Sequence, residues 1–181
     1  MPAEPSTPAI KRTFRLLLYD ALASEAMGTL ATGVFLTGFA VALGASNLEI
    51  GILAAVPSAV QFLQFPAVVL VERLRRRRAI CVWAAGIGRT FLIAASVASL
   101  LGGSVGVIVL IASIAIWQAS AAVAGCAWNS WMRDLVPEAS YGRFFGRRAA
   151  ANTAVAMTLA LLSGILIDRW KQFTPSHAIV A

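Results

Sequence analysis

The stretch TFLIAASVASLLGGSVGVIVLIASIAIWQASAAVAGCAWNSWM, residues Thr90–Met132, runs for 43 residues without a charged side chain. The hydrocarbon core of a bilayer is about 30 Å thick, and about 20 helical residues cross it. The stretch is too long for one crossing, and Gly102-Gly103-Ser104 in its middle predicts a turn. Because a helix satisfies its own backbone polar groups in lipid, we expect a hairpin of two membrane-spanning helices here.

Further charge-free windows flank this hairpin, and each has the length of one crossing: Ala26–Leu48, Ile50–Val71 and Ala149–Ile167. The first helix of the hairpin extends back to Ala79 and contains one charge, Arg89. The sequence therefore predicts an all-α integral membrane bundle with a tail over residues 1–15 and a helical region over 16–171. Its five spans are expected over residues 16–43, 50–71, 79–101, 105–127 and 149–167.

The composition excludes several classes of protein. Hydrophobic residues make up 59% of the chain and charged residues 13%, against about 45–50% and about 25% in soluble domains. Intrinsic disorder requires the opposite balance, with few hydrophobic and many charged residues.

Asp20 and Glu25 interrupt the first apolar run, so we expect a retained helix and no cleaved signal peptide. The single histidine, His177, belongs to no Ser/His, Cys/His or metal-spaced set, so we expect no enzyme, catalytic residue, metal or cofactor.

The basic residues alternate between connections. Twelve of the fifteen lie in the N-terminal tail, the second connection and the fourth connection. The positive-inside rule places these three segments, and the N-terminus, in the cytoplasm. Arginine outnumbers lysine 13 to 2, which favours a GC-rich bacterial genome and hence the inner membrane. The arginine run joins two membrane helices and has no interleaved aromatic residues, so we expect contact with lipid headgroups and no nucleic-acid partner.

Several polar side chains inside the spans are candidates for a substrate pathway. Glu25, Thr29 and Thr32 follow one another at four and three residues and share a helix face. The alternative for this face is a tight helix–helix interface. Gln61 and Gln64 lie between two prolines and are expected to avoid lipid and face the protein interior. They suit a pathway and a purely structural kinked helix equally well.

Arg89 is the strongest single candidate because it places a charge near the middle of its span. A charge there costs roughly 2.5–3.5 kcal/mol on insertion scales. It could form an ion pair with Asp20 or Glu25, bind a substrate or couple protons, or extend to the headgroups. Ser113 and Trp117 share a face of the next helix and complete the pathway candidates.

Three stretches at the predicted connections carry a resemblance to a known family. They are Leu43-Gly44-Ala45-Ser46 with Ile50-Gly51-Ile52-Leu53, the run Val68–Arg78, and Arg133–Pro137 with Tyr141-Gly142-Arg143 and Arg147. With the helix order and orientation, they resemble the major facilitator superfamily of secondary transporters. The run Val68–Arg78 occupies the place of that family's signature, which reads glycine, three residues, aspartate, arginine, then glycine and paired basic residues. Arg73, Arg77 and Arg78 match it, Glu72 stands for the aspartate, and Val68 and Arg75 stand where the signature has glycine.

The resemblance implies the N-terminal half of a twelve-helix transporter that moves a small solute by alternating access. We then expect five helices and a truncated sixth beginning within residues 172–181, with the C-terminal half missing. It also implies a cytoplasmic charge network. Its candidates are Glu72, Arg73, Arg77, Arg78, Asp134 and Arg143, although these charges could instead serve only to set topology. The rival interpretation of the whole chain is a small membrane scaffold or an oligomerising membrane protein without transport activity.

Overall fold

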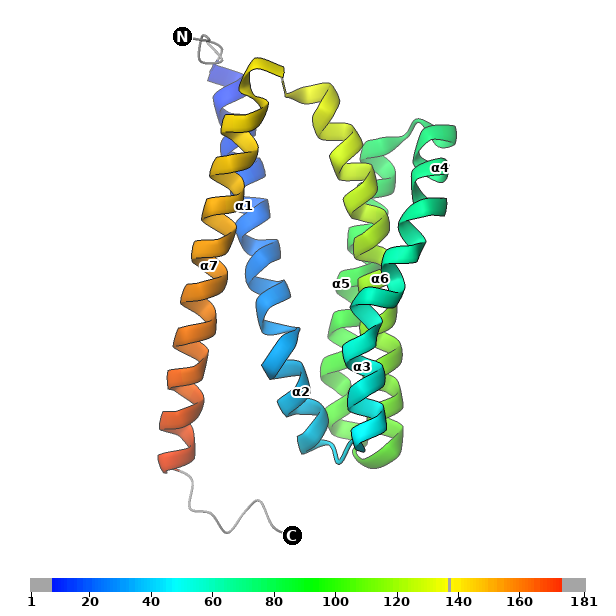
Figure 1. Cartoon of the computed structure of the whole chain (residues 1–181), viewed down its shortest axis with the longest axis vertical. Coiled ribbons are helices and arrows are strands. Elements are labelled where there is room, and N and C mark those ends of the chain that lie inside the picture. The colour runs from blue at the N-terminus through cyan, green and yellow to red at the C-terminus, as the bar shows by residue number, and fades with distance from the viewer. Residues whose placement is uncertain (1–7, 137, 174–181) are drawn as a thin grey trace. The chain divides into compact units, whose positions relative to one another are not determined.

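The computed structural model describes residues 8–136 and 138–173, and this part of the chain is helical without any strand (Figure 1). The elements in order are α1 (Pro8–Leu30), α2 (Gly33–Ala42), α3 (Asn47–Val60), the 3₁₀ turn η1 (Gln61–Leu63), α4 (Gln64–Leu74), α5 (Arg77–Leu101), α6 (Gly103–Leu135) and α7 (Glu138–Phe173). They form two compact units. One contains α1 and α7, and the other contains α2 to α6.

Five segments of the described chain are long and apolar enough to cross a membrane: Arg15–Ala42, Asn47–Leu74, Arg77–Ala98, Gly103–Asp134 and Ser140–Leu166. Two of them combine consecutive elements, α1 with α2 and α3 with α4. The prediction of an all-helical protein with five membrane-spanning helices is confirmed. The chain is a multi-pass membrane protein.

The helices extend beyond the spans expected from charge-free windows. α1 begins at Pro8, inside the predicted tail, and α7 begins at Glu138, where a long connection was expected. Charged residues end a hydrophobic window without ending a helix, because a helix can continue out of lipid into water. Between α6 and α7 the chain turns at Val136, whose backbone is extended as is usual before a proline. The expected start of a sixth helix falls on residues 174–181, which lie outside the described residues.

The α5–α6 hairpin forms the core of the α2–α6 unit. Only Gly102 separates the two helices, and both Gly102 and Gly103 have positive φ angles near 60°, which glycine adopts without strain. The predicted turn is therefore confirmed. α6 also packs on α3 and α4 (Figure 1), and the buried side chains come from all four helices: Leu53, Val56, Ala67, Val71, Ala95, Ala98, Val107, Leu110 and Ile114.

The second membrane segment is interrupted by η1, which lies between α3 and α4. Pro66 supplies the reason, because its ring lacks an N–H and clashes with the carbonyl four residues earlier, at Phe62. The backbone tightens into a 3₁₀ turn at that place. Pro57 lies inside α3, which begins at a reciprocal capping box formed by Ser46 and Glu49.

The α1–α7 unit consists of two long helices that lie side by side (Figure 1). Ala21 on α1 is buried. A polar contact, from Asn152 on α7 to Glu25 on α1, links the two helices. α1 ends at Leu30, and Gly33, with a φ of 60°, opens α2 in the other unit.

Candidate functional site

The connection between α4 and α5 concentrates the positive charge of the α2–α6 unit. α4 ends at Leu74, Arg75 takes a left-handed conformation with a φ of 49°, and α5 begins at Arg77. Arg73 and the four consecutive residues Arg75–Arg78 are all arginine. Because arginine stays charged at any ordinary pH, this turn stays in contact with water or with anionic groups.

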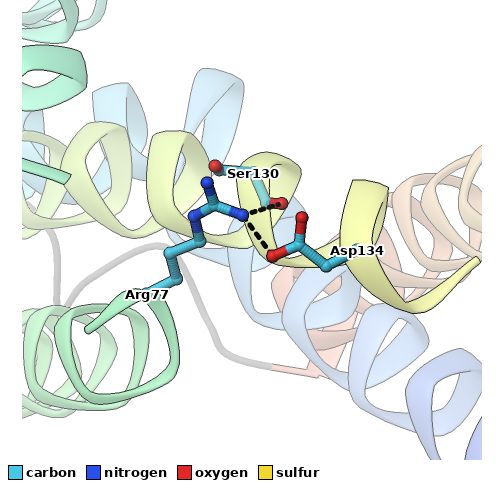
Figure 2. Close-up of polar contacts among 3 residues, drawn as sticks. All are labelled: Arg77, Ser130 and Asp134. Carbon is cyan, nitrogen blue, oxygen red and sulfur yellow. Dashed lines mark hydrogen bonds and ion pairs between the residues drawn. The ribbon is translucent and has the colours of Figure 1, made fainter. Parts of the chain in front are cut away.

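Arg77 joins this connection to the end of α6 (Figure 2). Its guanidinium forms an ion pair with the carboxylate of Asp134 and also donates a hydrogen bond to the backbone carbonyl of Ser130, at 3.4 Å. A cation at the C-terminal end of a helix is favourable, because the last carbonyls there carry partial negative charge. The side chains are 32% and 58% exposed, so water screens the pair, and it contributes about 0–1 kcal/mol to stability.

Glu72 of α4 lines a pocket together with this ion pair. The pocket has a volume of about 430 Å³ and is lined by Glu72, Arg75, Arg77 and Asp134. Two acidic and two basic side chains therefore surround one small volume. It lies where α4 and α6 end and α5 begins. Such an arrangement can exchange partners at little cost, since each charge has more than one opposite charge within the same pocket.

The structure thus brings together three of the six candidates for the cytoplasmic charge network: Glu72, Arg77 and Asp134. Arg73 and Arg78 are exposed nearby, and neither forms an ion pair with another described residue. Arg143 lies on α7, in the other unit, and its participation stays a prediction. Ser130 has a role that the sequence did not suggest, because a backbone carbonyl leaves no signature in the residue type.

A second polar contact lies inside the membrane segments of the α1–α7 unit. The Asn152 side-chain amide donates to the Glu25 carboxylate at 3.1 Å, and both residues are half-buried. Arg148, one helical turn before Asn152, lies within electrostatic range of Glu25 and Asp20. The other polar atom of Asn152, Oδ1, is buried and has no hydrogen-bond partner. Sequence reasoning missed Asn152, although an amide inside the apolar window 149–167 was an available signal.

The remaining polar candidates, on or next to α1 and on η1 and α4, form hydrogen bonds with groups close to them in the sequence. The hydroxyls of Thr29 on α1 and of Thr32, just after the end of α1, donate to the carbonyls of Glu25 and Gly28, each four residues earlier. This back-bonding is the usual state of a threonine inside a helix. Gln61 and Gln64 were expected to face the interior, but both are exposed and hydrogen-bond each other.

Arg89 on α5 and Ser113 and Trp117 on α6 differ in their exposure. Ser113 and Trp117 are buried in the core of the unit. A Cβ atom at Gly88 would lie 3.2 Å from Cδ1 of Trp117, so the indole packs directly on the α5 backbone. Arg89, the next residue, is exposed at the surface of the unit. It lies in a different unit from Asp20 and Glu25, so pairing with either carboxylate stays a prediction.

Among the described residues, histidine, cysteine, aspartate and glutamate form no group of three that could hold a metal ion. No family model, curated protein or solved structure matches the chain.

Proposed function

We propose that the chain is part of a membrane transporter that moves a small solute by alternating access, with a cytoplasmic charge network of the kind found in the major facilitator superfamily. The observation that carries the proposal is the ion pair between Arg77 and Asp134, with Glu72 in the same pocket. A network of this kind biases the equilibrium when it is intact in one state and broken in the other.

The backbone at Arg75 supports this interpretation independently. In the signature that the run Val68–Arg78 resembles, a glycine stands at the position of Arg75. Here Arg75 adopts a left-handed conformation, which costs a residue with a Cβ about 1–2 kcal/mol and glycine very little. The backbone conformation at this position is therefore one that glycine adopts with little strain, although the residue in this chain is arginine.

Polar groups within the membrane segments also favour transport over a scaffold. Glu25 and Asn152 hydrogen-bond each other inside two spans, and Arg89 is exposed within a third. Ionisable groups at such depths are costly and commonly mark substrate or proton pathways. A scaffold needs none of these groups, because apolar and small residues are sufficient for helix packing.

Removing the negative charge of Asp134 tests the proposal. In a background with alanine at Cys81 and Cys126, single cysteines replace Thr37 on α2 and Ala150 on α7, both exposed positions. Alternating access opens one side of a transporter while it closes the other. We therefore expect Asp134→Asn to raise the rate of maleimide labelling at one of the two cysteines and to lower it at the other. The change should be up to about fivefold, because a partly exposed pair contributes at most about 1 kcal/mol to the two-state equilibrium.

Two further variants control this experiment. Asp168→Asn removes the same charge from an exposed site on α7 and should leave both rates unchanged. The double exchange Arg77→Asp with Asp134→Arg should restore the original rates. Equal labelling before and after Asp134→Asn would contradict the proposal and favour the scaffold, and a parallel rise at both positions would indicate general loosening of the fold.

A further inference from the structure

A second and larger groove lies beside the charge network. It has a volume of about 620 Å³, and its wall consists of Arg75–Arg78, the adjoining residues Ala79, Val82 and Trp83 of α5, and Trp131 and Asp134 of α6. We call it the arginine groove. One end is cationic and the other is apolar and aromatic, so the groove suits a ligand with the same two parts.

Among the described residues, the cationic end carries more positive than negative charge. Four arginines line it and Asp134 is its one acidic residue. Asp134 is engaged by Arg77. Within the described part of the chain, Arg75, Arg76 and Arg78 form no ion pair, and all three are exposed. Guanidinium groups present paired N–H donors that match the oxygens of a phosphate.

The apolar end runs down α5 into a membrane-spanning segment. That segment begins at Arg77, so the groove lies where the bilayer surface meets the helix. Trp83 is 73% exposed, and Trp131 of α6 lines the same groove. Tryptophan is the residue that gathers at headgroup depth, with its ring toward the acyl chains and its N–H toward water.

From these observations we infer that the arginine groove is a binding site for an anionic phospholipid. The phosphate lies among Arg75, Arg76 and Arg78, and the upper acyl chains lie along Val82 and Trp83. A soluble phosphate compound would share the cationic end and leave the apolar end exposed. The inference depends on the membrane character of the chain and not on transport, so it stands or falls separately from the proposed function.

Brominated lipids, which quench tryptophan fluorescence on contact, test the inference. The full-length protein is reconstituted in phosphatidylcholine bilayers that contain a few per cent of brominated phosphatidylglycerol or of brominated phosphatidylcholine. Each arginine near an anionic surface is worth about a fivefold change in binding. We therefore expect at least tenfold stronger apparent binding of the anionic lipid, and Trp83→Phe should remove much of the quenching.

Two triple variants distinguish a specific lipid-binding site from a general electrostatic attraction between the protein and anionic lipid. Arg75→Gln, Arg76→Gln and Arg78→Gln together leave the Arg77–Asp134 pair in place and should reduce the preference at least tenfold. Arg15→Gln, Arg147→Gln and Arg169→Gln remove the same charge from exposed positions on α1 and α7 and should preserve the preference. Three outcomes would overturn the inference: equal quenching by the two lipids in the unaltered protein, equal losses in the two triple variants, and displacement by inorganic phosphate at constant ionic strength.

Discussion

Replacing Gly106 with alanine is expected to destabilise the α5–α6 hairpin by about 1–3 kcal/mol, the usual cost of overpacking a buried contact. Gly106 is buried on α6, and a Cβ atom there would lie 2.7 Å from the carbonyl oxygen of Ala98 on α5. That oxygen belongs to the backbone and cannot rotate away. The two helices would have to separate along the contact that forms the core of the unit.

The measurement is the midpoint of unfolding in a titration of mixed micelles with sodium dodecyl sulfate. Gly125→Ala is the matched control, because it lies on the same helix and a Cβ atom there meets nothing within 4 Å. Alanine is favoured over glycine in a helix by about 1 kcal/mol, so Gly125→Ala should leave the midpoint unchanged or raise it. If the two variants unfold at the same concentration, the close approach of α5 and α6 at Gly106 is wrong.

Arg89→Ala is expected to reduce solute transport by the full-length protein at least tenfold. Arg89 lies within the segment Arg77–Ala98 and is exposed on the α2–α6 unit. A guanidinium at that depth costs roughly 2.5–3.5 kcal/mol on insertion scales, and purely structural packing would be served better by an apolar residue. A charge at this depth fits a group that contacts a solute or moves charge. Initial rates of uptake into membrane vesicles measure the loss.

Thr90→Ala provides the control for Arg89→Ala. Thr90 is the next residue, is also exposed, and donates its hydroxyl to the Gly86 carbonyl of its own helix. It should transport at the rate of the unaltered protein, and Arg89→Lys should retain part of the activity because it keeps the positive charge. Normal transport by Arg89→Ala, at normal amounts in the membrane, would remove Arg89 from the pathway and leave it as a structural or topological charge.

The distances between charges predicted much of the fold, because lipid thickness sets the length of a spanning helix. The windows Ala26–Leu48, Ile50–Val71 and Ala149–Ile167 each overlap a membrane-spanning segment, and the glycine pair at Gly102 marks the hairpin. The helix ends were harder to predict. A helix that leaves the bilayer has no reason to stop at the first charge, so α1 and α7 begin earlier than the windows suggest.

The candidate site was less accessible to sequence reasoning. The resemblance to a transporter family implied one charge network that includes Glu72, Arg77 and Asp134, but the pairing of Arg77 with Asp134 depends on how α5 packs on α6. The contact between Glu25 and Asn152 depends on the register of α1 against α7. Ser113 and Trp117 were candidates for a pathway because of their spacing, and the structure shows that the same spacing places them in the core.

Solute flux into proteoliposomes tests the central claim most directly. Vesicles that contain the full-length protein are exposed to a panel of small solutes, and their contents are compared by mass spectrometry with those of protein-free vesicles. We expect saturable uptake of at least one chemical class of solute, strongly reduced by Arg89→Ala and unaffected by Thr90→Ala. Uptake that matches protein-free vesicles for every solute, with the protein inserted and folded, would contradict the claim that the chain belongs to a transporter.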